Sequence, residues 1–237
     1  MESQICCEIE CMEVAPLAEE ALFRLWLDRM PEIRRRKVAS LRFAEGRRLS
    51  LGAGILLFRA LEKRGLDGAR TEIRENEFGQ PCFPDHPDLH FSLSHAGTWA
   101  MCAVSGAPVG CDAERLGRGN GRLARYCLTP EELEALERKK DPGEWDREFT
   151  RFWTRKESYL KATGRGMSLR MSSFSVLPGE EGRWFEERPM AEGYVFSVCG
   201  LGRKTGSTVW RRVRLEDDPE GKPSADAHAA AVGPDTP

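Results

Sequence analysis

Apolar side chains recur at the helical period between about residues 144 and 163. A helix with this pattern presents one apolar stripe, which it buries against its neighbours. The stripe consists of Trp145, Phe149, Phe152, Trp153, Tyr159 and Leu160. The sequence Gly164-Arg165-Gly166 that follows is typical of a helix end. We therefore expect a helix over 144–163.

Elsewhere the pattern changes between the helical period and the extended period. We expect helices over 17–30, over 49–61, and from the capping box Thr129-Pro130-Glu131-Glu132 to about residue 140. Strands are expected over 4–14, 71–75, 89–94, 98–105, 108–114, 172–177, 184–187, 194–198 and 207–213.

The order of helices followed by strands occurs in 17–105 and again, loosely, in 129–213. This order predicts an α+β fold, a pseudo-dimer of two similar halves, each a helix packed on a small antiparallel sheet. We assign residues 1–107 to the N-terminal half and 108–215 to the C-terminal half. Residues 216–237 are acidic and then rich in Pro, Ala and Gly, so we expect them to be disordered.

The overall composition narrows the class of protein. The chain has 237 residues, a net charge of −2 and 40% hydrophobic residues, which is ordinary for a soluble globular protein and argues against a general nucleic-acid binder. We find no apolar run long enough to span a bilayer and no charged-then-apolar leader. The eight cysteines show no paired CxxC spacing, so we interpret them as reduced thiols and expect a cytoplasmic protein.

Two groups of charged residues suggest a metal and phosphate site. Glu157 and Lys161 are four residues apart, so they share one face of the expected helix, where the alternative is a simple surface ion pair. Asp112 and Glu114 are two apart in an expected strand, so both carboxylates point to one side of it. Three carboxylates and a lysine make a magnesium–phosphate site.

Two further stretches carry polar groups that suit anions. The segment 31–48 is crowded with arginine and lysine, which indicates either a solvated helix face or a surface for phosphate or an acidic partner. Ser94 and His95 stand at the end of an expected strand. Adjacent strand residues point to opposite faces, so a Ser–His nucleophile pair is disfavoured, and an anion contact fits better. The alternative is a loop histidine without a task.

These stretches together resemble the Sfp-type 4′-phosphopantetheinyl transferases. The resemblance extends over roughly 31–199 and includes the basic segment. It also includes the motifs Phe78-Gly79-Gln80-Pro81, Phe91-Ser92-Leu93-Ser94-His95-Ala96-Gly97, Val109-Gly110-Cys111-Asp112-Ala113-Glu114 and Phe152-Trp153-Thr154-Arg155-Lys156-Glu157-Ser158-Tyr159-Leu160-Lys161. The order and separations of the motifs make the resemblance specific.

The resemblance implies coenzyme A and Mg²⁺ bound between the two halves. It implies that Asp112, Glu114 and Glu157 hold the metal and that Ser94 and His95 meet phosphate groups. Arg36 and Arg48 fall at the family's cationic and neighbouring phosphate contacts, and Gly79, Gln80 and Pro81 line the adenine side. The family pattern has lysine where this chain has Gln80, so one phosphate contact is neutral and neighbouring arginines would have to supply the charge.

The implied reaction transfers the 4′-phosphopantetheine arm of coenzyme A to a serine of an apo acyl or peptidyl carrier protein and releases adenosine 3′,5′-bisphosphate. Charge grows on the phosphate oxygens, so a metal ion and Lys161 suit the stabilising roles, and Glu157 suits the acceptor of the serine proton. Arginines in 115–125, with Arg165, suit an acidic carrier. We expect a monomer with neither a nucleic-acid nor a membrane partner. The alternatives are a Mg²⁺-dependent phosphodiesterase or nuclease and a non-enzymatic coenzyme A-binding module. The carrier, its pathway and the tolerance for acyl donors stay open.

Overall fold

The computed structural model describes residues 5–215. The expected tail 216–237 lies outside the described residues. The helices are α1 (Glu20–Arg29), α2 (Glu32–Ser40), α3 (Ala44–Glu62), α4 (Gly121–Cys127), α5 (Pro130–Glu137) and α6 (Pro142–Thr163). The strands are β1 (Ile5–Glu13), β2 (Arg74–Glu75), β3 (Pro81–Cys82), β4 (His90–Ala96), β5 (Trp99–Ser105), β6 (Val109–Arg115), β7 (Arg183–Arg188), β8 (Tyr194–Leu201) and β9 (Ser207–Val213). This is an α+β fold, as the sequence predicts.

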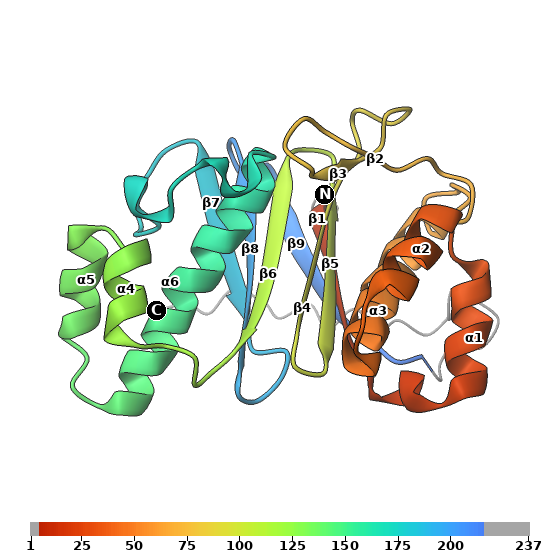
Figure 1. Ribbon diagram of the computed structural model, residues 1–237. Helices are drawn as coiled ribbons and strands as arrows, with labels where there is room; N and C mark the ends of the chain where they lie inside the picture. The colour runs from red at the N-terminus through yellow and green to blue at the C-terminus, as the bar shows by residue number, and fades with distance from the viewer. Residues whose placement is uncertain (1–4, 216–237) are drawn as a thin grey trace.

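The strands lie in the middle of the molecule, with α1–α3 on one side and α4–α6 on the other (Figure 1). One sheet has the strand order β4-β5-β1-β9, and a second has the order β6-β8-β7. The hairpin β2–β3 forms a separate small ribbon. Within the described residues, no helix is long and apolar enough to cross a membrane.

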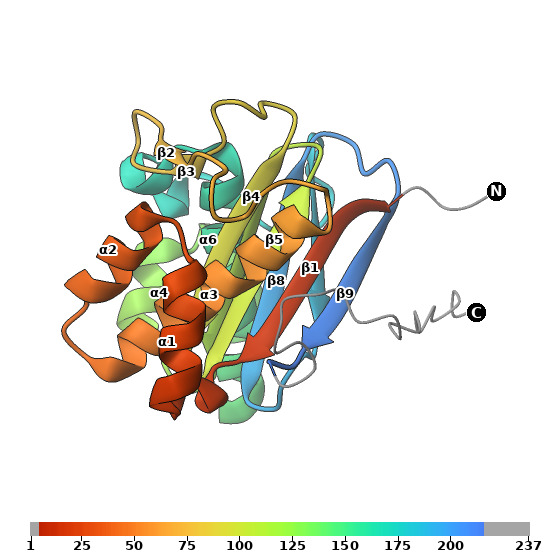
Figure 2. The same cartoon turned by 90° about the vertical axis from the view of Figure 1, so that its right-hand side faces the viewer.

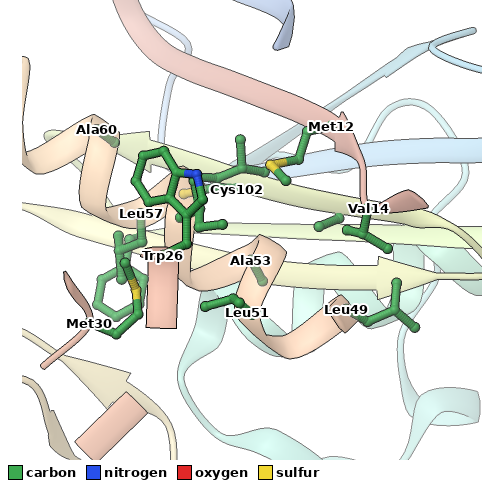
Figure 3. Close-up of a cluster of buried hydrophobic side chains, with 14 of the residues drawn as sticks. Met12, Val14, Trp26, Met30, Leu49, Leu51, Ala53, Leu57, Ala60 and Cys102 are labelled. Atoms are coloured by element: carbon green, nitrogen blue, oxygen red, sulfur yellow. The ribbon is translucent and has the colours of Figure 1, made fainter. Parts of the chain in front are cut away.

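Three hydrophobic clusters fix these layers. The first fills the space between α1–α3 and the first sheet and contains the fully buried Trp26 and Leu51 (Figure 3). The second lies where the two sheets meet, with Trp99 of β5 packed edge-on against Phe196 of β8 at 5.9 Å between ring centroids. The third joins α4–α6 and includes Phe149. Each layer therefore buries its apolar face against the next.

The last strand departs from the expected arrangement. We predicted 207–213 as part of a second antiparallel sheet, but β9 pairs in parallel with β1 and lies in the first sheet (Figure 2). Glu186 of β7 then bridges the edges of the two sheets, because its carboxylate accepts hydrogen bonds from Trp210 Nε1 at 3.0 Å, from Lys204 Nζ at 2.8 Å and from the Thr208 hydroxyl. The two sheets are thus joined through side chains at β7 and β9.

One other local expectation was wrong. The strand expected over 172–177 is absent, and only a short 3₁₀ turn at Met171–Ser173 occurs there. Helix α4 follows β6, and its first turn is capped by the Asn120 side chain accepting from Leu123 N at 2.9 Å. The capping box at Thr129 is confirmed, with Glu132 Oε2 accepting from Thr129 N at 2.8 Å.

Candidate active site

Strand β6 and helix α6 are packed backbone against backbone. A Cβ on Gly110 would come within 1.9 Å of Ser158 O and 2.5 Å of Ala162 N of α6, so no larger residue fits at this position. This close approach brings the polar residues of β6 beside those of α6. The order of strand, connector and helix therefore places Asp112, Glu157 and Lys161 in one region.

Asp112 is the centre of this region and is 4% exposed. Its Oδ1 accepts from Lys161 Nζ at 2.7 Å and from Ser94 Oγ at 2.8 Å. Lys161 Nζ also donates to Cys111 O at 3.0 Å. Asp112 Oδ2 is buried and has no hydrogen-bond partner, which is costly for a carboxylate oxygen. One side of this carboxylate is thus free to bind a cation.

Ser94 and Ser92 join β4 to β6 through their side chains. Ser92 Oγ accepts from Cys111 N at 3.0 Å, and Ser94 Oγ accepts from Ala113 N at 3.2 Å. The serine hydroxyls therefore take the place of backbone carbonyls along this seam. The Ser94 hydroxyl also donates to Asp112, and the anion contact predicted for Ser94 stays a prediction.

The other two carboxylates have raised pKa values. Burial and the charges of Asp112 and Glu114 raise the pKa of Glu157 to about 7, although Lys161 opposes the shift. Burial and the charge of Asp112 also raise the pKa of Glu114, whose carboxylate pairs with Arg118 at 3.0 Å. Burial lowers the pKa of Lys161, but Asp112 more than offsets this and the net shift is upward. Three carboxylates thus face two cations, Lys161 and Arg118, and the region keeps an excess of negative charge.

A cleft of about 530 Å³ opens over these groups. Most of the residues predicted for the site line it, and they come from the hairpin β2–β3, β4, β6 and α6. They are Gly79, Gln80, Pro81, Ser94, His95, Asp112, Glu114, Glu157 and Lys161. Phe78 and Trp153 also line the cleft.

The positive side of the cleft differs from the prediction. Arg34 and Lys37 of α2 line it, whereas Arg36 and Arg48 do not. Arg36 is exposed and pairs with Glu32 at 2.7 Å. Burial lowers the pKa of His95, and the neighbouring charges of Lys161, Arg34 and Lys37 add to the effect. Burial first, and then these cations, thus favour the neutral form of the His95 imidazole.

The sequence carries a signal for Arg34. Val38 is the buried residue of α2, and Arg34 precedes it by one helical turn, so both lie on the face turned toward the protein. Arg34 donates to Ser50 O and lies against Gly54 of α3. Its Nε is buried without a partner, so the guanidinium keeps hydrogen-bonding capacity.

The carboxylates suit a hard cation, although they do not form a complete cage. Among the described residues, no group of three His, Cys, Asp or Glu side chains is arranged to hold a metal ion by itself. The unpartnered Asp112 Oδ2 and the mutually raised pKa values of Glu114 and Glu157 nevertheless fit an oxygen-ligated ion that also takes ligands from a substrate. The fold and the cleft thus define an α+β protein with an acidic cleft that also contains a lysine.

Comparison with known proteins gives the family. A family model described as the 4′-phosphopantetheinyl transferase superfamily matches residues 108–199. A 4′-phosphopantetheinyl transferase of Bacillus subtilis is 34% identical over 145 residues, which cover 61% of this chain and 64% of that protein. The 4′-phosphopantetheinyl transferase Sfp of Bacillus subtilis (strain 168) is 33% identical over 160 residues, which cover 62% of this chain and 71% of that protein. The chain belongs to the 4′-phosphopantetheinyl transferase superfamily.

Proposed function

We propose that this protein transfers the 4′-phosphopantetheine arm of coenzyme A to a serine of an apo acyl or peptidyl carrier protein, in a Mg²⁺-dependent reaction. The serine oxygen forms a bond to the phosphorus that carries pantetheine, and the pyrophosphate bond to adenosine 3′,5′-bisphosphate breaks. The observation that carries this proposal is the Asp112–Lys161 pair at the floor of the cleft, with Asp112 Oδ2 left open. The relatives named above are transferases of this type by name.

The donor binds along the cleft between its positive side and its carboxylate side. Arg34, Lys37 and His95 face its phosphates, because they line the cleft where positive charge accumulates. Gly79, Gln80 and Pro81 line the adenine side. Arg36 and Arg48 stay proposals for phosphate contacts, and Arg36 would have to leave Glu32 to make one.

Asp112, Glu114 and Glu157 are the residues that would hold Mg²⁺. When bound, the ion neutralises the charge that develops on the phosphate oxygens. Lys161 donates from Nζ toward the leaving phosphate while Asp112 holds it in place. Glu157, whose pKa is about 7 without the ion, accepts the proton from the serine hydroxyl.

The partner surface lies on the C-terminal side of the cleft. Arg115, Arg118, Arg122 and Arg125 are exposed near Glu114, and Arg165 is exposed beyond α6. These charges suit a carrier protein that presents an acidic helix beside its target serine.

We also propose the finer points of the architecture. The halves 1–107 and 108–215 form a pseudo-dimer, supported by a long helix against each sheet and by the β4/β6 seam between them. The protein acts as a monomer in the cytoplasm. The free state of all eight cysteines supports this compartment.

The test is the intact mass of a panel of apo carrier proteins incubated with coenzyme A, Mg²⁺ and the protein. We expect one phosphopantetheine unit on the target serine, lost with EDTA or with Asp112→Ala. Coenzyme A binding without transfer to any carrier would instead favour a binding module. Hydrolysis of nucleotides or nucleic acid without a carrier would favour a phosphodiesterase.

A further inference from the structure

The turn between β2 and β3 is held by one asparagine side chain. Asn76 Oδ1 accepts from Phe78 N and from Gln80 N, both at 2.9 Å. The backbone closes the same turn, since Asn76 N donates to Gln80 O at 2.8 Å. Gly79 adopts a φ of 77°, which favours glycine. The turn is thus a rigid unit that can be docked as a whole.

Two side-chain amides dock this turn on the end of α6. Asn76 Nδ2 donates to Gly164 O at 3.0 Å, and Gln80 Nε2 donates to Lys161 O. Lys161 lies in the last turn of α6 and Gly164 is its C-cap residue, so both acceptors lie at the helix end, where carbonyls lack the regular partner four residues further on. The hairpin and the helix are more than 80 residues apart in the chain, so this contact is tertiary.

The contact between the turn and α6 involves Lys161, which belongs to the candidate active site. Lys161 is held at its carbonyl by Gln80 and at its ammonium by Asp112. Four residues line both the main cleft and a second cavity of about 210 Å³, namely Gln80, Pro81, Phe91 and Lys161. The bond from Gln80 to Lys161 therefore forms part of the wall that separates the two spaces.

We propose that Gln80 is a positioning residue that fixes the hairpin wall of the cleft against α6 and does not contact phosphate. This inference rests on the proposed function, because it assigns Gln80 the task of keeping the coenzyme A donor in the main cleft. The family pattern has lysine at this position, and this chain uses an amide that bonds to a neutral carbonyl. The charge for phosphate comes from Arg34 and Lys37 of α2, which also line the cleft.

The test compares Gln80→Met with Glu77→Met. Methionine has a similar length but no donor, and Glu77 is an exposed position in the same turn. Hydrogen exchange of the segment 74–82 reports the docking without any need for activity. We expect faster exchange in Gln80→Met and no change in Glu77→Met, because only the former loses the bond to α6.

Coenzyme A affinity and transfer kinetics give the second readout. We expect the Kd and the KM for coenzyme A to rise about fivefold in Gln80→Met, as for the loss of one neutral hydrogen bond, with a smaller change in kcat. The position of Lys161 should change less than that of the hairpin, because Asp112 and Gly164 N still bind Lys161. Gln80→Lys keeps a donor of sufficient reach, so it should restore slow exchange.

The outcomes separate this inference from the proposed function. Unchanged exchange in Gln80→Met, fast exchange in Gln80→Lys, or a loss of kcat without a change in KM would overturn the positioning role. Suppose instead that the wild type modifies no carrier, while Gln80→Met shows faster exchange and weaker coenzyme A binding. The proposed function then fails and the positioning role stands.

Discussion

Helix α6 carries two lysine–carboxylate pairs that differ in how completely they are satisfied. Lys156 pairs with Glu132 at 2.8 Å, and both side chains are 0% exposed. Lys156 Nζ also donates to Met171 O at 2.9 Å and Phe174 O at 2.6 Å, while Glu132 accepts from Val176 N at 2.7 Å. Every polar atom of this pair therefore has a partner inside the protein.

The pair of Lys161 with Asp112 lies at the cleft and is incomplete. Lys161 is 28% exposed in its side chain, and Asp112 keeps one buried oxygen without a partner. Glu157, one turn before Lys161, adds a second carboxylate with a raised pKa. The comparison shows that burial alone does not mark a site. A closed pair destabilises the fold when one partner is removed, whereas a pair with an unpartnered oxygen at a cleft is a candidate for ligand binding.

Breaking the closed pair should have the largest effect. Lys156→Met leaves Glu132 charged and buried without its partner, so we expect a loss of about 3–5 kcal/mol in the free energy of unfolding. Denaturant unfolding measures this. Arg138→Met is the control, because Arg138 and Glu134 form an exposed pair that should contribute less than about 1 kcal/mol. Equal effects of the two variants would contradict the structural role of Lys156.

Changing the open pair should affect turnover more than stability. Glu157→Gln removes the proposed proton acceptor and a metal ligand, so we expect kcat to fall about a hundredfold at saturating Mg²⁺. Without the ion, the same variant should be as stable as the wild type or more so, because it removes a carboxylate that Asp112 and Glu114 repel. Full turnover in this variant would count against Glu157 as the acceptor.

The sequence predicts those parts of the site that depend on local periodicity. Asp112 and Glu114 are two apart along β6, and Glu157 and Lys161 are four apart along α6. The spacing therefore predicts that the members of each pair share one face of their element. Tertiary contacts decided the rest. The pairing of β9 with β1 joins residues about 200 positions apart in the chain, and no local pattern encodes that choice.

The absent strand at 172–177 has the same kind of cause. Phe174 O accepts from Lys156 and Val176 N donates to Glu132, so the backbone groups that a sheet would need are bonded to buried side chains. The pattern of the segment is extended, but side chains from α5 and α6 take its hydrogen bonds.

The open pair should also make stability depend on pH. The pKa of Glu157 is raised from 4.5 to about 7, so the folded state binds its proton more tightly than the unfolded chain does. The resulting contribution to the free energy of unfolding is fully present below about pH 4.5 and is lost as the pH rises through about 7. Without Mg²⁺ we expect a loss on the order of 1 kcal/mol across this window, reduced by solvent screening.

Melting curves from pH 4.5 to 8, with and without Mg²⁺, measure this dependence. The ion should reduce the decline, because it favours the ionised carboxylates. Glu157→Gln should flatten the curve of the metal-free protein. The prediction fails if the melting temperature of the wild type rises through this window and matches that of Glu157→Gln. Ionised Glu157 would then not destabilise the folded state.

The smallest effect should come from the ion pair between Glu114 and Arg118. Arg118 is 72% exposed in its side chain and pairs with Glu114 at 3.0 Å, so it competes with a metal ion for that carboxylate. Because an exposed pair contributes less than about 1 kcal/mol, Arg118→Gln should raise the affinity for Mg²⁺ by only about twofold. Calorimetric titration with Mg²⁺ measures this, and Arg122→Gln is the control because Arg122 is exposed on the neighbouring helix α4. A drop in affinity in Arg118→Gln would mean that Glu114 needs Arg118 to hold its orientation. The pair would then belong with the closed pair of Lys156 and not with the open one.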